Sequence, residues 1–312
     1  MTFVELFSSY TFKVVTMGCV LLGVISGIVG SFAVVKKQGL IGDGISHSTL
    51  PGVVLAFLII GVKDTQIMLI GALIAGLLSA ALIFAIVKNS RVKFDSALAV
   101  VMSVMFGFGT LLLSYSQKLP NANQAGLKNY IYGQAANMLS SDVETMLVVG
   151  VIVLVIVLLF WKEMKLVSFD LEYAITMGYN VSLINGIMIL LLVLAIIIGL
   201  QTVGVILMSA MIISPAVAAR QWTNKFSMMV ILSAIFGATA GILGSFISIT
   251  DEKLATGPIV VVVATMIAII SILISPKRGI VYKLYQRKKN KKELEKRFDE
   301  KRNDKIEEKV VR

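Results

Sequence analysis

The hydrophobic pattern of the chain consists of long apolar runs separated by short polar connections. A helix of about 20 apolar residues is long enough to cross the hydrocarbon core of a bilayer. The runs cover approximately residues 11–35, a segment ending at 62, 66–87, 95–114, 143–160, 182–200, 203–219, 226–249 and 257–275. The second and seventh runs are short. If either entered and left the membrane on the same side, the number of spans would change between odd and even. We therefore predict an all-α, polytopic transmembrane bundle of about eight or nine spans.

Lys and Arg favour one side of this predicted bundle. With the N-terminus outside, the connections on the inner side carry Lys36, Lys37, Lys88, Arg91, Lys93, Lys162, Lys165, Arg220 and Lys225. Cytoplasmic loops of membrane proteins carry an excess of Lys and Arg. The pattern predicts a multi-pass protein whose C-terminus is cytoplasmic.

Composition agrees with a membrane protein, because 57% of the 312 residues are hydrophobic and the mean hydropathy is +0.89. Fifteen of the 29 Lys and Arg lie in residues 277–312, so the net charge of +11 belongs mainly to the end of the chain. This distribution indicates a solvated tail near anionic headgroups and gives no reason to expect nucleic acid. We divide the chain into a transmembrane domain, 1–280, and a charged cytoplasmic tail, 281–312.

One polar segment, residues 42–52, interrupts this apolar sequence and contains the chain's one histidine. Asp43 and His47 are four residues apart and would share a helix face. Ionisable residues at membrane depth suggest a substrate or ion pathway, and carboxylate and imidazole both bind divalent metals. The alternative is structural, with Asp43 as a helix cap and His47 bonded to a carbonyl. Pro51 and Gly52 are expected to break the helix that follows, and broken helices line cavities in membranes.

A site with one Asp and one His has too few ligands to enclose a metal. A two-fold dimer would bring two of each to its axis, which could hold a divalent cation and still release it. We therefore expect a second protomer, most simply an identical one.

Residues 166–180 are amphipathic and too polar to cross a membrane. Asp170 or Ser168 is placed to cap a helix there, and Gly178 to end it. The helix could lie on lipid, but its polar face is acidic, which fits a soluble protein partner better than anionic lipid. Glu172, Ala174 and Gly178 also match the E-A-A-x-x-x-G core of the coupling loop in ABC importer permeases.

Other features are structural or absent. Pro215 removes a backbone donor inside the seventh run and should kink it. Glycines at 23, 27, 30, 71, 76, 237, 241 and 244 are interpreted as packing positions, since small residues let membrane helices approach closely. The sequence contains no Walker A, His-Glu-x-x-His or G-x-S-x-G motif, so we expect no enzymatic activity in this chain and no ATP hydrolysis by it.

Four segments together resemble the membrane permease subunit of manganese/zinc/iron ABC importers, the ABC-3 family. Residues 42–52 are similar to its L-G-D-G-x-S-H-A-x-x-P-G signature. Residues 95–98 resemble its E-D-x-A-I-G region, 130–133 its Y-L-F-G segment, and 203–216 its V-G-x-L-L…P-A stretch. The likeness covers most of residues 10–280, and the chain departs from the signature at Ile41 and Ser48 and in its long tail.

This resemblance implies the permease fold of the cobalamin and metal-chelate importers, in the cell membrane of a prokaryote. It implies that Asp43 and His47 contact the transported metal, Mn²⁺ or Zn²⁺, and that 166–180 is a coupling helix. The implied partners are cytoplasmic ATP-binding subunits, which carry the ATP, and an extracellular metal-binding lipoprotein or periplasmic protein. No permanently bound cofactor is expected.

Two other functions fit the same pattern of spans. A permease for an iron chelate or cobalamin would need a wide cavity and no direct Asp–His contact. An ion-coupled secondary metal carrier would need no ATPase subunit.

Overall fold

The computed structural model describes residues 10–61, 64–118, 133, 135, 138–250, 255–276, 279–283, 286–287, 289–291 and 293. The described residues form helices only, which confirms the predicted all-α class. The helices are α2 (Tyr10–Val35), α3 (Ile41–Ser48), α4 (Leu50–Ile60), α5 (Thr65–Asn89), α6 (Phe94–Ser116), α8 (Ser140–Leu159), α9 (Trp161–Phe169), α10 (Leu171–Thr176), α11 (Val181–Thr202), α12 (Val205–Trp222), α13 (Phe226–Thr250) and α14 (Thr256–Ile274). The predicted tail, 281–312, lies largely outside the described residues.

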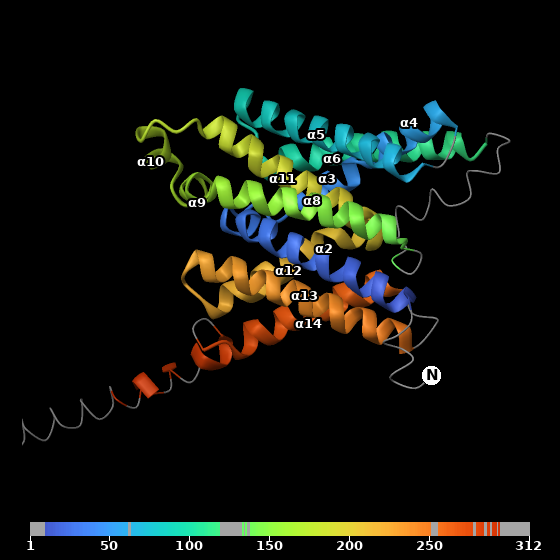
Figure 1. Cartoon of the computed structure of the whole chain (residues 1–312). Coiled ribbons are helices and arrows are strands. Elements are labelled where there is room, and N and C mark those ends of the chain that lie inside the picture. Colours follow the sequence, from blue (N-terminus) through green and yellow to red (C-terminus); the bar gives the residue numbers. More distant parts are fainter. Residues whose placement is uncertain are drawn as a thin grey trace, which may run out of the picture.

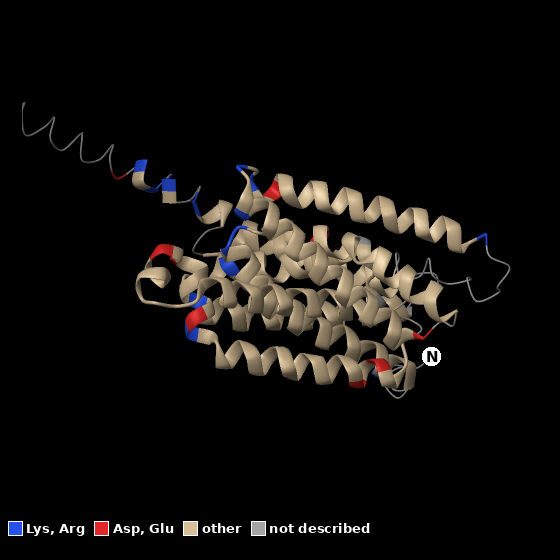
Figure 2. Cartoon of the chain, turned by 90° about the horizontal axis from the view of Figure 1, so that it is seen from above, with Lys and Arg blue, Asp and Glu red and all other residues tan. Residues whose placement is uncertain are grey.

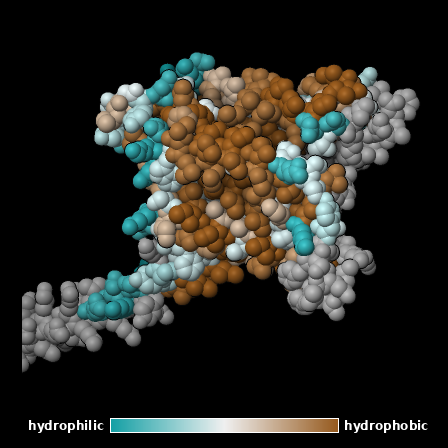
Figure 3. Space-filling model, in the orientation of Figure 1, coloured by the Kyte–Doolittle hydropathy of each residue, from teal (hydrophilic) through white to brown (hydrophobic). Residues whose placement is uncertain are grey.

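Eight described helices, with α3 and α4 taken as one, are long and apolar enough to cross a membrane, which agrees with the predicted eight or nine spans. They run side by side, and a broad apolar surface covers the middle of the bundle, with hydrophilic residues toward its two ends (Figures 1 and 3). The helix α12 is not among the eight, although it packs between α2, α13 and α14.

The centre of the bundle is α2, which packs against α8, α11, α12 and α13. Its buried positions include three glycines, at 23, 27 and 30. A methyl group at Gly23 would overlap the carbonyl of Gly237, and one at Gly27 would lie 2.5 Å from the carbonyl oxygen of Ser233. Position numbers rise along α2 as they fall along α13, so the two helices are antiparallel and touch backbone to backbone.

Close approach at a glycine also joins other pairs of helices. Gly30 lies against the carbonyl of Ile212 in α12, and Gly52 of α4 lies against Gly71 of α5. Gly244 of α13 approaches Val260 of α14. These contacts agree with the packing role expected for the glycines, because no hydrophobic effect drives helices together in lipid and close approach must supply dispersion contacts instead.

Replacing Gly23 with Ala should destabilise the protein by about 1–3 kcal/mol, the usual cost of forcing an atom into a packed interface. The added methyl group meets backbone of α13, which has no rotamer through which to move away. Thermal unfolding in detergent would measure the loss.

The matched control is Gly186→Ala in α11, where nothing lies within 4 Å of the added group. Equal unfolding temperatures for the two variants would contradict the packing role of Gly23.

Candidate metal centre and coupling segment

The predicted metal ligands Asp43 and His47 lie one turn apart on α3. A short connection after α2 places this helix, and Lys37 turns the chain there with a φ of 59°. The Asp43 Oδ1 and His47 Nε2 atoms are 3.5 Å apart. Two ligands of one tetrahedral ion with bonds near 2.1 Å would be separated by roughly 3.4 Å. The pair therefore has the spacing of two donors to one cation.

The rest of the pair's surroundings come from α6 and α12. The His47 ring meets Phe106 of α6 edge to face, with ring centres 5.0 Å apart. The Ser209 hydroxyl of α12 is placed to donate a hydrogen bond to the Asp43 carboxylate. The His47 Nδ1 atom is buried and has no hydrogen-bond partner among the described residues.

Two tight contacts fix the position of α3. A methyl group at Gly44 would lie 2.5 Å from Cδ1 of Leu98 in α6, and one at Gly42 would lie 3.2 Å from Cδ1 of Ile212 in α12. Asp43 and His47 therefore belong to the first half of the candidate span Ile41–Ile60, packed against α6 and α12.

The pair is not enclosed by its own chain. The His47 side chain is 21% exposed and the Asp43 side chain 38% exposed. Within the described part of the chain, no cluster of three or more His, Cys, Asp or Glu side chains is arranged to hold a metal. An exposed carboxylate in a bilayer is costly, so this face requires water or another protein surface beside it.

Three residues were predicted to break or kink a helix, Pro51, Gly52 and Pro215, and each lies in a different setting. The helix is interrupted at Thr49, just before Pro51, and Gly52 continues within α4 at its contact with Gly71. A proline has no N–H to donate, so the carbonyl four residues earlier loses its helical partner, which explains a break ahead of Pro51. Pro215 lies inside α12, where the helix continues past it.

The segment 166–180, predicted as one helix, contains the end of α9 and the whole of α10, and the two helices meet at Asp170. Asp170 caps α10, and its Oδ1 accepts a hydrogen bond of 2.9 Å from the Tyr173 amide. Gly178 follows α10 with a φ of 79°, a conformation that favours glycine. Ala174 is fully buried, whereas Glu172 on the same turn is exposed. In Figure 1, α10 projects beyond the end of the bundle.

Comparison with known proteins places this arrangement in a family. Residues 8–275 match the family described as the ABC 3 transport family. The chain belongs to this family. It is a membrane permease of an ABC transport system, as its sequence resemblance predicted.

Its relatives cover nearly the whole permease. The zinc transport system membrane protein TroC of Treponema pallidum is 45% identical, over 91% of this chain and 96% of TroC. The manganese transport system membrane protein MntC of Bacillus subtilis is 43% identical, over 86% of this chain and 62% of that protein. The solved structure of PsaBC from Streptococcus pneumoniae in complex with Fab matches with a TM-score of 0.77 and 32% identity, over 88% of this permease and 95% of the matched chain.

Sequence reasoning alone missed two neighbours of the permease's Asp–His pair, Phe106 and Ser209. Ser209 is a polar residue in an apolar run, which is a weak signal, and Phe106 resembles any other apolar residue of its span. Neither could be assigned to the site, because their contacts depend on how α6 and α12 pack against α3.

Replacing Asp170 with Ala should loosen α10 without affecting the membrane-spanning helices. Loss of a helix cap costs about 1 kcal/mol, which corresponds to roughly fivefold faster amide exchange through local opening. Hydrogen–deuterium exchange of residues 171–178 would detect the change.

Glu172→Ala is the control, since this exposed side chain makes no described contact that caps α10. Unchanged exchange in the Asp170 variant would mean that the cap does not hold α10.

Proposed function

We propose that this permease belongs to an ATP-driven importer of a divalent transition metal, with Asp43 and His47 as its in-membrane metal site. The observation that supports the proposal is a carboxylate and an imidazole 3.5 Å apart, partly exposed and part of the candidate span Ile41–Ile60. The arrangement suits transport because an open site with few ligands can take up an ion and release it again.

A second copy of the permease would complete the site. Two-fold symmetry would bring two carboxylates and two imidazoles together, and it would also cover the exposed face of α3. The dimer offers four donors from four side chains, which is enough for a divalent cation that keeps some water. We therefore propose a homodimer with the metal between its protomers.

Manganese is the proposed cargo, with zinc and iron as the alternatives. The site offers carboxylate, hydroxyl and imidazole donors, and the chain's one cysteine is buried in α2. Oxygen donors suit manganese, although imidazole also suits zinc, which binds most such sites more tightly. The named functions of the relatives include both manganese and zinc transport.

The charges favour one orientation of the permease in the cell membrane. Blue residues gather at the end of the bundle that carries α9, α10 and the last described residues (Figure 2). Described Lys and Arg at that end include Lys36, Lys88, Arg91 and Lys162. Cytoplasmic loops are rich in Lys and Arg, so we infer that this end and the C-terminal tail are cytoplasmic.

This orientation places α10 where ATP-binding subunits would dock. Its surface is apolar and exposed outside the spans, at Leu171, Tyr173, Ile175 and Met177. The acidic Asp170 and Glu172 disfavour anionic lipid as the partner of this surface. We propose that α10 is the coupling helix, that ATP is hydrolysed by separate subunits bound there, and that an extracellular binding protein delivers the metal to the opposite end.

Replacing Asp43 or His47 with Ala should abolish uptake of radioactive manganese, because each variant removes half of the ligands in the dimer. Cells without their own importer, expressing the permease with its ATP-binding subunits and binding protein, would provide the measurement. Zinc is tested in parallel.

Glu144→Gln, an exposed acidic position at the start of α8, is the control and should transport normally. Manganese uptake that remains in both the Asp43 and the His47 variant would contradict the proposed metal site. Transport without ATP-binding subunits would instead favour a secondary carrier, and absence of any metal uptake would favour a chelate.

Replacing Ile175 with Asp should reduce co-purification of the ATP-binding subunits by about tenfold or more, since burying an unpaired carboxylate in an interface is costly. Ile175 is 58% exposed, so the variant should fold normally.

The same substitution at Ile280, which is exposed beyond the last span at the same end, is the control. Equal recovery of the subunits with both variants would argue against docking at α10.

A further inference from the structure

Four aromatic side chains form a cluster at the end of the bundle that carries α9 and α10. We call this the aromatic cluster, and it consists of Phe32, Trp161, Phe169 and Phe226. Phe226 of α13 is its centre, with ring centres 5.0 Å from Phe32, 5.5 Å from Trp161 and 5.5 Å from Phe169. Phe32 and Trp161 also meet edge to face at 5.9 Å. Such offset and edge-to-face pairs have preferred geometries and resist sliding.

The cluster attaches both ends of α9 to the core of the bundle. Trp161 is the first residue of α9 and Phe169 the last. Between them, Met164 and Val167 are buried on the inner face of the same helix. Phe169 directly precedes Asp170, the cap of α10. The helix that leads into α10 is therefore held at both ends by ring contacts with Phe226.

One turn beyond Phe32, Lys36 makes a polar contact with α11. Lys36 Nζ donates a hydrogen bond of 2.6 Å to Oδ1 of Asn185 in the first turns of α11, the helix that follows α10. Burial lowers the pKa of the Lys36 ammonium to about 8. An amide oxygen that accepts from a half-buried cation makes a charge-assisted contact, so the end of α2 is joined to the helices on both sides of α10.

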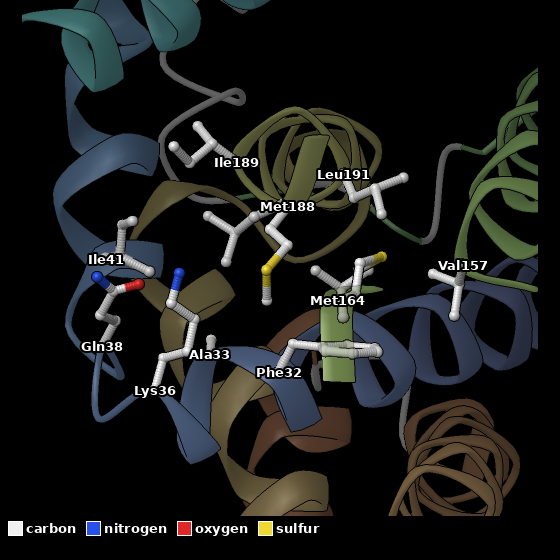
Figure 4. A pocket seen from close by; sticks show the side chains of 12 residues that line it. Phe32, Ala33, Lys36, Gln38, Ile41, Val157, Met164, Met188, Ile189 and Leu191 are labelled. Carbon is white, nitrogen blue, oxygen red and sulfur yellow. The ribbon is translucent and has the colours of Figure 1, made fainter. Parts of the chain in front are cut away.

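The same lysine lies beside the start of α3. Lys36 lines a cavity of about 20 Å³ together with Met164 of α9, Met188 of α11 and Ile41, the first residue of α3 (Figure 4). Only one residue, Gly42, separates Ile41 from Asp43. The connection therefore runs from α10 through α9 and α11 to the α2–α3 turn, and from there to the Asp–His pair.

We propose that the aromatic cluster and the Lys36–Asn185 hydrogen bond are positioning groups that transmit movement of α10 to Asp43 and His47. The inference rests on the proposed function, in which α10 is the coupling helix. It assigns coupling to particular side chains of α2, α9, α11 and α13, none of which touches the metal or the ATP-binding subunits in this proposal.

The test uses the complete importer, purified and reconstituted in vesicles, with ATP hydrolysis and manganese uptake measured in the same sample. The variants are Phe226→Leu, which keeps an apolar side chain but removes the ring contacts, and Lys36→Met, which removes the hydrogen bond. We expect manganese moved per ATP to fall by about fivefold or more, in the range of ordinary coupling between sites. ATP hydrolysis and manganese binding should stay close to wild type.

Phe84→Leu is the matched control. Phe84 pairs with Phe94 at 5.8 Å and joins α5 to α6, away from α9 and α10. Its ratio of manganese to ATP should be unchanged. Lys36→Arg, which keeps a cationic donor, should recover most of the ratio lost in Lys36→Met.

The proposal is overturned if both variants keep the wild-type ratio, or if uptake and hydrolysis fall in the same proportion, as they would after a general loss of folded protein. If the importer with Phe226→Leu does not assemble, the test rests on two variants alone: Lys36→Met should lower the ratio of manganese to ATP, and Lys36→Arg should restore it. Failure of the proposed function is seen separately, as a wild-type complex that does not couple ATP to uptake or an Asp43→Ala complex that transports normally.

Discussion

The contact on which the rest of this permease depends is the backbone approach of α2 to α13. Glycine at 23 and 237 brings two main chains together where any side chain would overlap a carbonyl. Lipid supplies no hydrophobic force between helices, so dispersion contacts over such a tight interface must hold them. Because α2 also contacts α8, α11 and α12, its position sets where the other helices lie.

The candidate metal site follows from this packing. The chain leaves α2 through a tight turn and enters α3, which is held between Leu98 of α6 and Ile212 of α12. Asp43 and His47 then project from a face that no described helix covers completely. The fold thus presents a polar, partly exposed pair in a candidate membrane span, and this openness is what the proposed transport site would need, since structural metal sites are closed.

The two candidate functional regions, α3 and the α9–α10 segment, both follow α2 in the sequence and approach the same end of it. α9 packs on Phe32, and α3 begins a few residues beyond it. The short polar turns at this end carry most of the described positive charge, and the exposed apolar residues of α10 lie there as well. A single end of one central helix therefore lies between the proposed docking surface on α10 and the proposed metal ligands on α3.

The sequence by itself determined the all-α class, most of the helix boundaries, the Asp43–His47 spacing, and the end of the segment around α10 at Gly178, while it left the cap open between Ser168 and Asp170. These features are local, since they depend on run length, helical period and capping chemistry. The tertiary structure alone decided that Ser209 and Phe106 adjoin the pair, that Gly52 is a contact with Gly71, and that Phe32, Trp161, Phe169 and Phe226 converge. Such contacts join residues far apart in the sequence, and their register depends on how closely the glycines let the helices approach, which no local pattern contains.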